Sequence, residues 1–80
     1  MTVDLRSVQT IRAIELVLES AWVPYRIEYS VDGETYHTLF EGKKDQLMVE
    51  LTDLSVEARY IRVQRDGENW FSIFELKIYG

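Results

Sequence analysis

The residues best suited to binding chemistry lie in two short segments that contain the chain's two tryptophans. In one segment, Trp70 and Phe71 follow a run of polar residues that includes Arg65, Glu68 and Asn69. Exposed aromatic rings often serve binding, and the polar residues beside these rings could hydrogen-bond to a ligand. The alternative is that one ring begins the following strand and packs on the rim of the core. The residues alone leave both interpretations open.

Trp22 occupies the second segment, two residues before Pro24. It could form a second aromatic wall beside Trp70 if both segments lie at the same end of the molecule. A bulky residue close to a proline more often closes the end of a β-core, and tryptophan is usually highly buried. We therefore favour a core position for Trp22 and keep ligand contact as the alternative.

The residue types give little indication of a catalytic site or a metal site. His37 is the single histidine, and cysteine is absent. Because metal sites need several convergent ligands, we expect His37 to be a surface residue of a strand. We find no serine with an assignable base, no glycine-rich phosphate loop and no distinct carboxylate pair. We predict that the protein is not an enzyme and uses no cofactor.

Composition limits the classes of partner. Nine Lys and Arg residues against 14 Asp and Glu residues leave a formal net charge of −5. Such a surface repels phosphate backbones, so nucleic acid is not an expected partner. No apolar run reaches the length of about 18 residues that suggests a membrane span, and the first residues lack the apolar stretch of a signal peptide. Eighty residues give room for a single domain, residues 1–80.

The elements that must position these residues are mostly strands. From Tyr25 to Val31, apolar and polar residues alternate with a period of two, which predicts a strand with one buried and one wet face. Asp32 and Gly33 follow, a dipeptide that closes tight hairpins. The run from Thr35 to Phe40 is rich in β-forming residues. These features predict a β-hairpin in the middle of the chain.

Three later segments show the same alternation, with polar breaks between them. They run from Gln46 to Thr52, from Ala58 to Gln64 and from Phe71 to Tyr79. Several short strands at near-regular spacing predict an antiparallel β-sandwich or barrel. The segment from Val8 to Ser20 is ambiguous, because Ile11, Ile14 and Leu18 form a helical stripe while Ile14, Leu16 and Leu18 also alternate as in a strand.

Four motifs, in this order along the chain, resemble the second half of a known family of domains. They are Val3 to Leu5 followed by Ile11 and Ile14, the run from Tyr25 to Gly33, the run from Ala58 to Val63, and the run from Ser72 to Gly80. The chain resembles the discoidin or coagulation-factor type C domains, a galactose-binding-like family that includes sugar-binding modules of bacterial glycoside hydrolases. The resemblance implies an all-β fold, an antiparallel β-sandwich of reduced jelly-roll type, and favours a strand from Val8 to Ser20.

The chain departs from the family pattern at its start and in one loop. Family members normally carry roughly forty to sixty more residues ahead of Val3, including most of a structural calcium site, so we expect a domain truncated on its N-terminal side. Glu75 is at a family calcium position, but an ion pair with Arg59, Arg62 or Lys77 is the favoured alternative. The arginine and asparagine that often contact sugar in the loop around Trp22 are not evident here.

The resemblance implies a non-catalytic carbohydrate-binding module, accessory to a larger secreted or cell-surface glycoside hydrolase. Its predicted ligand residues are Trp70, Phe71, Asn69, Trp22 and Arg65, with an aromatic ring stacked on the apolar face of a sugar. We expect one weak carbohydrate site. The alternative is a structural or protein-interaction sandwich without a ligand, which self-associates as a homodimer or docks on a neighbouring domain through an unpaired strand edge.

Overall fold

The computed structural model describes residues 2–19, 24–65 and 73–80, and all regular structure in this part of the chain is β-strand. The strands are β1 (Thr2–Ile11), β2 (Ala13–Leu18), β3 (Tyr25–Ser30), β4 (His37–Gly42), β5 (Met48–Leu51), β6 (Val56–Arg65) and β7 (Ile73–Tyr79). Every strand pair is antiparallel. The predicted all-β, antiparallel architecture is confirmed.

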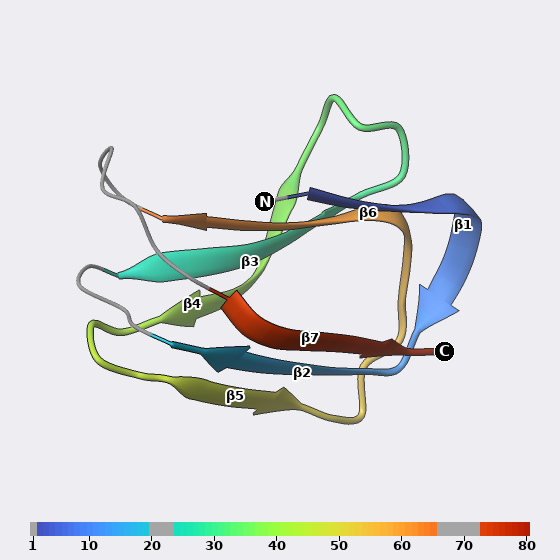
Figure 1. The fold of residues 1–80 in the computed structure, drawn as a ribbon. Coiled ribbons are helices and arrows are strands. Elements are labelled where there is room, and N and C mark those ends of the chain that lie inside the picture. The colour runs from blue at the N-terminus through green and yellow to red at the C-terminus, as the bar shows by residue number, and fades with distance from the viewer. Residues whose placement is uncertain (1, 20–23, 66–72) are drawn as a thin grey trace.

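The strands form two sheets that face each other (Figure 1). One sheet has the order β1-β6-β3-β4, and the other has the order β5-β2-β7. Side chains from both sheets build a single buried cluster: Ile11, Ile14, Leu16, Leu18, Tyr25, Ile27, Val49, Ala58, Ile61 and Val63. On β2, and on β6 from Ile61 to Arg65, the buried residues alternate with exposed or half-buried ones, as the period of two predicts. The sandwich therefore has one core between two sheets.

The ambiguous segment from Val8 to Ser20 forms strands, but two of them in different sheets. β1 ends at Ile11, and β2 begins at Ala13 in the opposite sheet. At the crossing residue Arg12, the amide donates to the Tyr79 carbonyl at 2.8 Å. Ile11 and Ile14 both face the core because the chain changes sheets between them. The three-residue spacing between Ile11 and Ile14, which resembled the periodicity of a helix, results from this change of sheet.

The β3–β4 hairpin is confirmed, although its connection is longer than a tight turn. Asp32 Oδ1 accepts hydrogen bonds from the amides of Glu34 and Thr35, at 2.8 and 2.9 Å. These bonds hold both residues in the loop, so β4 begins at His37 and not at Thr35. Gly33 has a φ of 80°, the left-handed region that favours glycine.

The outer face of β3 is less wet than its sequence pattern predicts. Glu28 and Ser30 are buried, whereas only their inward-facing neighbours were expected to be. The reason is that the hairpin loop folds back over this face and places the Tyr36 ring 3.7 Å from the Arg62 guanidinium. Arg62 in turn donates to Glu28 at 2.9 Å. A long loop thus protects an ion pair that a tight turn would leave in solvent.

Candidate functional site

The strands β2, β4 and β6 end, and β3 begins, at one end of the sandwich (Figure 1). Tyr25, the first residue of β3, lies opposite both Gly42 at the end of β4 and Arg65 at the end of β6. The amide of Leu18, at the end of β2, donates to the Leu47 carbonyl just before β5. The β4–β5 turn, residues 43–47, is therefore close to the described residues that flank segments 20–23 and 66–72.

Most of the predicted ligand residues fall in those two segments. Trp22, Asn69, Trp70 and Phe71 lie outside the described residues, and their proposed roles stay predictions. Arg65 is described: it is the last residue of β6, and its exposed fraction is 8%. The sequence placed Arg65 in a polar loop, but the regular pairing of β6 with β3 continues as far as this residue. Its role toward a ligand is likewise still a prediction.

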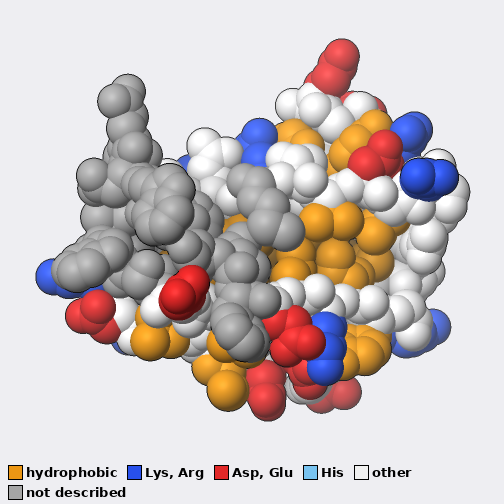
Figure 2. Space-filling view, in the orientation of Figure 1, with side chains coloured by type: hydrophobic (Ala, Val, Ile, Leu, Met, Phe, Trp, Pro, Cys, Tyr) orange, Lys and Arg blue, Asp and Glu red, His pale blue; other side chains and the backbone are white. Residues whose placement is uncertain are grey.

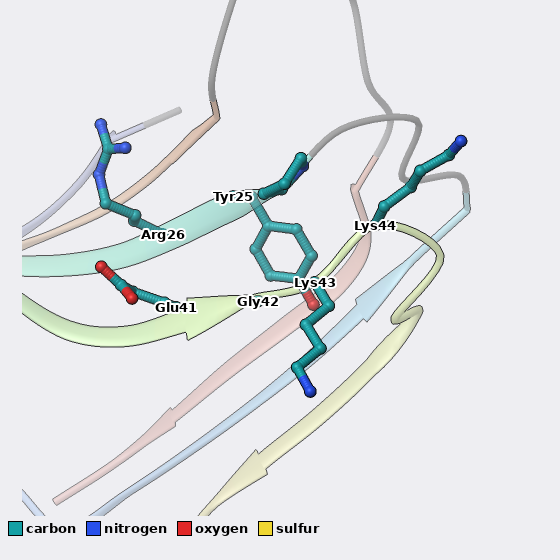
Figure 3. A pocket seen from close by; sticks show the side chains of 7 residues that line it. Tyr25, Arg26, Glu41, Gly42, Lys43 and Lys44 are labelled. Atoms are coloured by element: carbon teal, nitrogen blue, oxygen red, sulfur yellow. The ribbon is translucent and has the colours of Figure 1, made fainter.

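A pocket of about 370 Å³ opens at this end, lined by residues 24–26 and 41–44 (Figure 3). The walls of the pocket are formed by β3 and β4. The Tyr25 ring extends from β3 toward Gly42 on β4, and the Tyr25 hydroxyl points toward the β4–β5 turn (Figure 3). The hydroxyl donates to the Gln46 carbonyl at 2.7 Å. Burial raises the pKa of Tyr25, which keeps the phenol neutral and able to donate. The tyrosine thus ties β3 to the turn.

Gly42 makes this arrangement possible. A Cβ atom at this position would overlap the Tyr25 ring, so any larger residue would force the ring out of its place. Neither Gly42 nor Tyr25 was predicted as a site residue. A usable signal was present, because Gly42 lies between a run rich in β-forming residues and a charged turn.

The turn itself is fixed by Gln46. The Gln46 amide donates to the Lys43 carbonyl at 3.0 Å, and the Gln46 side-chain oxygen accepts from the Lys43 amide at 3.1 Å. Asp45 has a positive φ of 65°. The result is a closed turn that presents Lys43 and Lys44 to solvent, with a second, shallower hollow of about 540 Å³ along its other side.

The pocket carries more positive than negative charge. Arg26 on β3 lies opposite Glu41 on β4, and both side chains project on the same side of the strands in Figure 3. Arg26 also approaches Glu28 at 3.7 Å. With Lys43 and Lys44, the lining residues supply three cations and one carboxylate beside an aromatic ring. Such a surface can hydrogen-bond a polar ligand, whereas the Tyr25 ring is 2% exposed and belongs to the core.

The remaining candidates from the sequence lie away from this pocket. His37 is exposed at the opposite end of β4, as predicted, with its ring centroid 5.4 Å from that of Tyr29. Glu75 pairs with Lys77 at 3.5 Å, which is one of the three partners expected for it, and the Glu75 charge raises the pKa of Lys77. Within residues 2–19, 24–65 and 73–80, no three His, Cys, Asp or Glu side chains gather as metal ligands. The described residues therefore do not fit a calcium site at Glu75.

The described residues also include no helix of the length and hydrophobicity that membrane crossing requires.

Comparisons with solved structures place the fold among sugar-binding modules. Chitosan-binding module 1 of a chitosanase/glucanase from Paenibacillus sp. IK-5 is 28% identical, with a TM-score of 0.79, and the match covers 99% of this chain and 66% of that one. Module 2 of the same enzyme, solved with chitotriose, is 24% identical, with a TM-score of 0.79 and coverages of 99% and 67%. CBM32-1 from a family 31 glycoside hydrolase of Clostridium perfringens is 19% identical, with a TM-score of 0.80 and the same coverages.

This chain thus spans about two thirds of the length of the solved modules that it matches. Among curated proteins, no sequence matches it. The model of one domain family, the F5/8 type C domain, matches residues 1–76. That match covers nearly the whole sequence and agrees with the all-strand sandwich, so this chain belongs to the F5/8 type C domain family.

Proposed function

We propose that this protein is a non-catalytic carbohydrate-binding module whose site is the pocket between Tyr25 and the β4–β5 turn. Two kinds of observation support the proposal. The family and the solved neighbours include modules that are named for binding chitosan or for belonging to glycoside hydrolases. The chain has a pocket lined by charged side chains at one end of its sandwich.

One observation carries the proposal: the pairing of Tyr25 with Arg65. Arg65 directly precedes segment 66–72, which contains Asn69, Trp70 and Phe71. In the proposed mode, Trp70 or Phe71 stacks on the apolar face of a sugar ring. Lys43, Lys44 and Glu41 at the pocket then hydrogen-bond to its hydroxyl groups. We retain Trp22 as a second aromatic contact.

Charge narrows the class of sugar within this proposal. Three cationic side chains and one carboxylate line the pocket, and like charges at short distance repel. We therefore propose that neutral or acidic sugars bind more tightly than protonated amino sugars. A single site of this size gives weak affinity, and its use is to raise the local concentration of an attached enzyme on its polymer. Such a role belongs outside the cell or at its surface.

The test is an NMR titration with three oligosaccharides of different charge: N-acetylglucosamine oligomers, chitosan oligomers and oligogalacturonate. We expect saturable shifts of the Tyr25, Lys43 and Lys44 amides with the neutral or acidic sugars, and weaker shifts with chitosan oligomers. Trp70→Ala should weaken the affinity for these sugars at least tenfold, because stacking on the ring is lost. A tenfold loss of affinity corresponds to about 1.4 kcal/mol of binding free energy.

A matched pair of charge reversals checks the location. Lys44→Glu changes the pocket, whereas Arg12→Glu makes the same change at the opposite end of β2. Only the first should alter binding of the acidic sugar. Unchanged spectra with all three sugars would reject the proposed function, and equal effects of the two reversals would reject the proposed pocket.

A further inference from the structure

The free edge of β7 stands out from the other sheet edges of the molecule. β7 pairs with β2 on one side and has no strand on the other among the strands that the structure describes. An edge strand exposes backbone N–H and C=O groups that can pair with another chain, and proteins usually protect such edges with bulges, short strands or charges. The other three edges show the first two of these protections.

The comparison among edges can be made strand by strand. β1 is interrupted between Asp4 and Gln9, and the register of β4 shifts opposite Ile27 and Glu28. β5 has only four residues. β7 also shifts register between Ile73 and Glu75, but it then keeps a continuous register from Glu75 to Tyr79, five residues without a break. It is the longest regular edge in the described part of the sandwich.

An apolar surface accompanies this edge. Figure 2 shows hydrophobic side chains exposed in the gap between β7 and the sheet of β1 and β6. Leu76 and Ile78 on β7, and Leu5 on β1, pack against the core but are only partly buried. These partly buried side chains form an apolar strip, and exposed apolar surface favours association.

We propose that a second copy of this chain covers the strip, with β7 of each copy paired antiparallel about a twofold axis at Leu76. In this register Leu76 lies opposite its own counterpart on the inner face. On the outer face, Glu75 lies opposite the second copy's Lys77, and Lys77 lies opposite the second copy's Glu75. Directly opposite side chains in an antiparallel pair contact each other, and opposite charges there are favourable.

Charge selects this register over its neighbours. An axis at Glu75 would place the two Glu75 carboxylates opposite each other, and an axis at Lys77 would place the two ammonium groups opposite each other. Both arrangements are repulsive. Only the axis at Leu76 pairs each of these two charges with its opposite.

The geometry also brings the apolar strips together. A twofold axis perpendicular to the sheet keeps the inner faces of both copies on the same side. The combined sheet then has the order β5-β2-β7-β7-β2-β5, and the strips around Leu76 and Leu5 of the two copies meet at its centre. This interaction is independent of the pocket, which lies at the end of the sandwich beyond Leu18 and Tyr25.

The decisive experiment is sedimentation-equilibrium analysis of the full chain and four variants over a wide concentration range. The unchanged protein should dimerise reversibly. Lys77→Glu and Glu75→Lys should each weaken the dimer at least tenfold, because each places like charges opposite one another twice. An equimolar mixture of these two variants should form heterodimers, and the double variant Glu75→Lys, Lys77→Glu should dimerise as the unchanged protein does.

Lys43→Glu serves as the matched control, because it makes the same charge change on the β4–β5 turn, and it should leave the dimer intact. Circular dichroism checks that each variant is folded, which these exposed positions favour. A monomer at every concentration, or a dimer that neither Lys77→Glu nor Glu75→Lys weakens, would overturn the proposal. Sugar titration of the Lys77→Glu variant separates the two proposals, since the pocket shifts should persist when the dimer is lost.

Discussion

The pocket end and the β7 edge of the molecule differ in how the sandwich is closed. At the pocket end, one buried tyrosine, one glycine and one glutamine hold three strands and a turn together. Along β7, partly buried leucine and isoleucine side chains face a gap. The closed end leaves a hollow suited to a small polar ligand, whereas the open side is suited to another strand. The pocket end is thus suited to ligand binding and the β7 edge to protein association.

The largest effect should come from removing the tyrosine that closes the pocket end. Tyr25→Ala deletes a ring that is 2% exposed, and deletions of buried aromatic rings cost about 3–5 kcal/mol. Leu76→Ala, at the open side, should cost clearly less in unfolding free energy because its side chain is only partly buried. Urea unfolding of both variants measures the difference. Equal losses of unfolding free energy in the two variants would contradict the proposed difference between the two regions.

A smaller but more specific effect is expected at Gly42. Gly42→Ala forces a methyl group against the Tyr25 ring, and overpacking of this kind costs about 1–3 kcal/mol. In a Tyr25→Ala background the same change should cost little, because the ring that it strikes is gone. A double-mutant cycle on unfolding free energy measures this coupling. Strictly additive losses would contradict the assigned contact.

Alkaline pH provides a third way to open the pocket end. Burial raises the folded-state pKa of Tyr25 above its ordinary value of 10.0. The stability that the neutral phenol contributes is therefore complete below about pH 10 and is lost as the pH rises from there through the folded pKa. Tyr25→Phe should remove this part of the alkaline loss. Thermal unfolding as a function of pH measures it, with Tyr79→Phe on β7 as the comparison.

The smallest effect should appear in acid, at the hairpin loop far from both regions. Amide hydrogen bonds from Thr35 and Glu34 lower the pKa of Asp32 below 3.8. The contribution of the carboxylate is complete above about pH 4 and is lost as the pH falls through the lowered value. Asp32→Asn keeps an acceptor oxygen and should flatten this acid dependence while changing stability at neutral pH little. An unchanged acid slope would contradict the role given to the carboxylate.

Much of the fold could be predicted from local pattern. The order of apolar and polar residues predicted the strands β3 and β6 and the hairpin at Asp32 and Gly33, whereas it left the segment that contains β2 ambiguous. The sheet crossing at Arg12 could not be predicted in this way, because its spacing imitates a helix. The burial of Glu28 was also not predicted. Tyr36 and Arg62 cover Glu28, and the contact between these two residues depends on how the hairpin loop folds back.

The site was predicted less completely than the fold. The residue types predicted aromatic ligand residues in segments 20–23 and 66–72, and these lie outside the described residues. Tyr25 was predicted only as an inward-facing residue of a strand. The contribution of Tyr25 depends on a turn twenty-one residues away and on a glycine that clears space for its ring. Neither is visible in the alternation of a single strand.

The way in which Tyr25 holds the β4–β5 turn has an evolutionary consequence. Its hydroxyl bonds to a main-chain carbonyl, and the turn is otherwise closed by Gln46. The side chains of Lys43 and Lys44 take no part in these bonds, so mutation can exchange them while the backbone keeps its course. New ligand preferences can therefore arise at this turn by single substitutions, with the scaffold left unchanged.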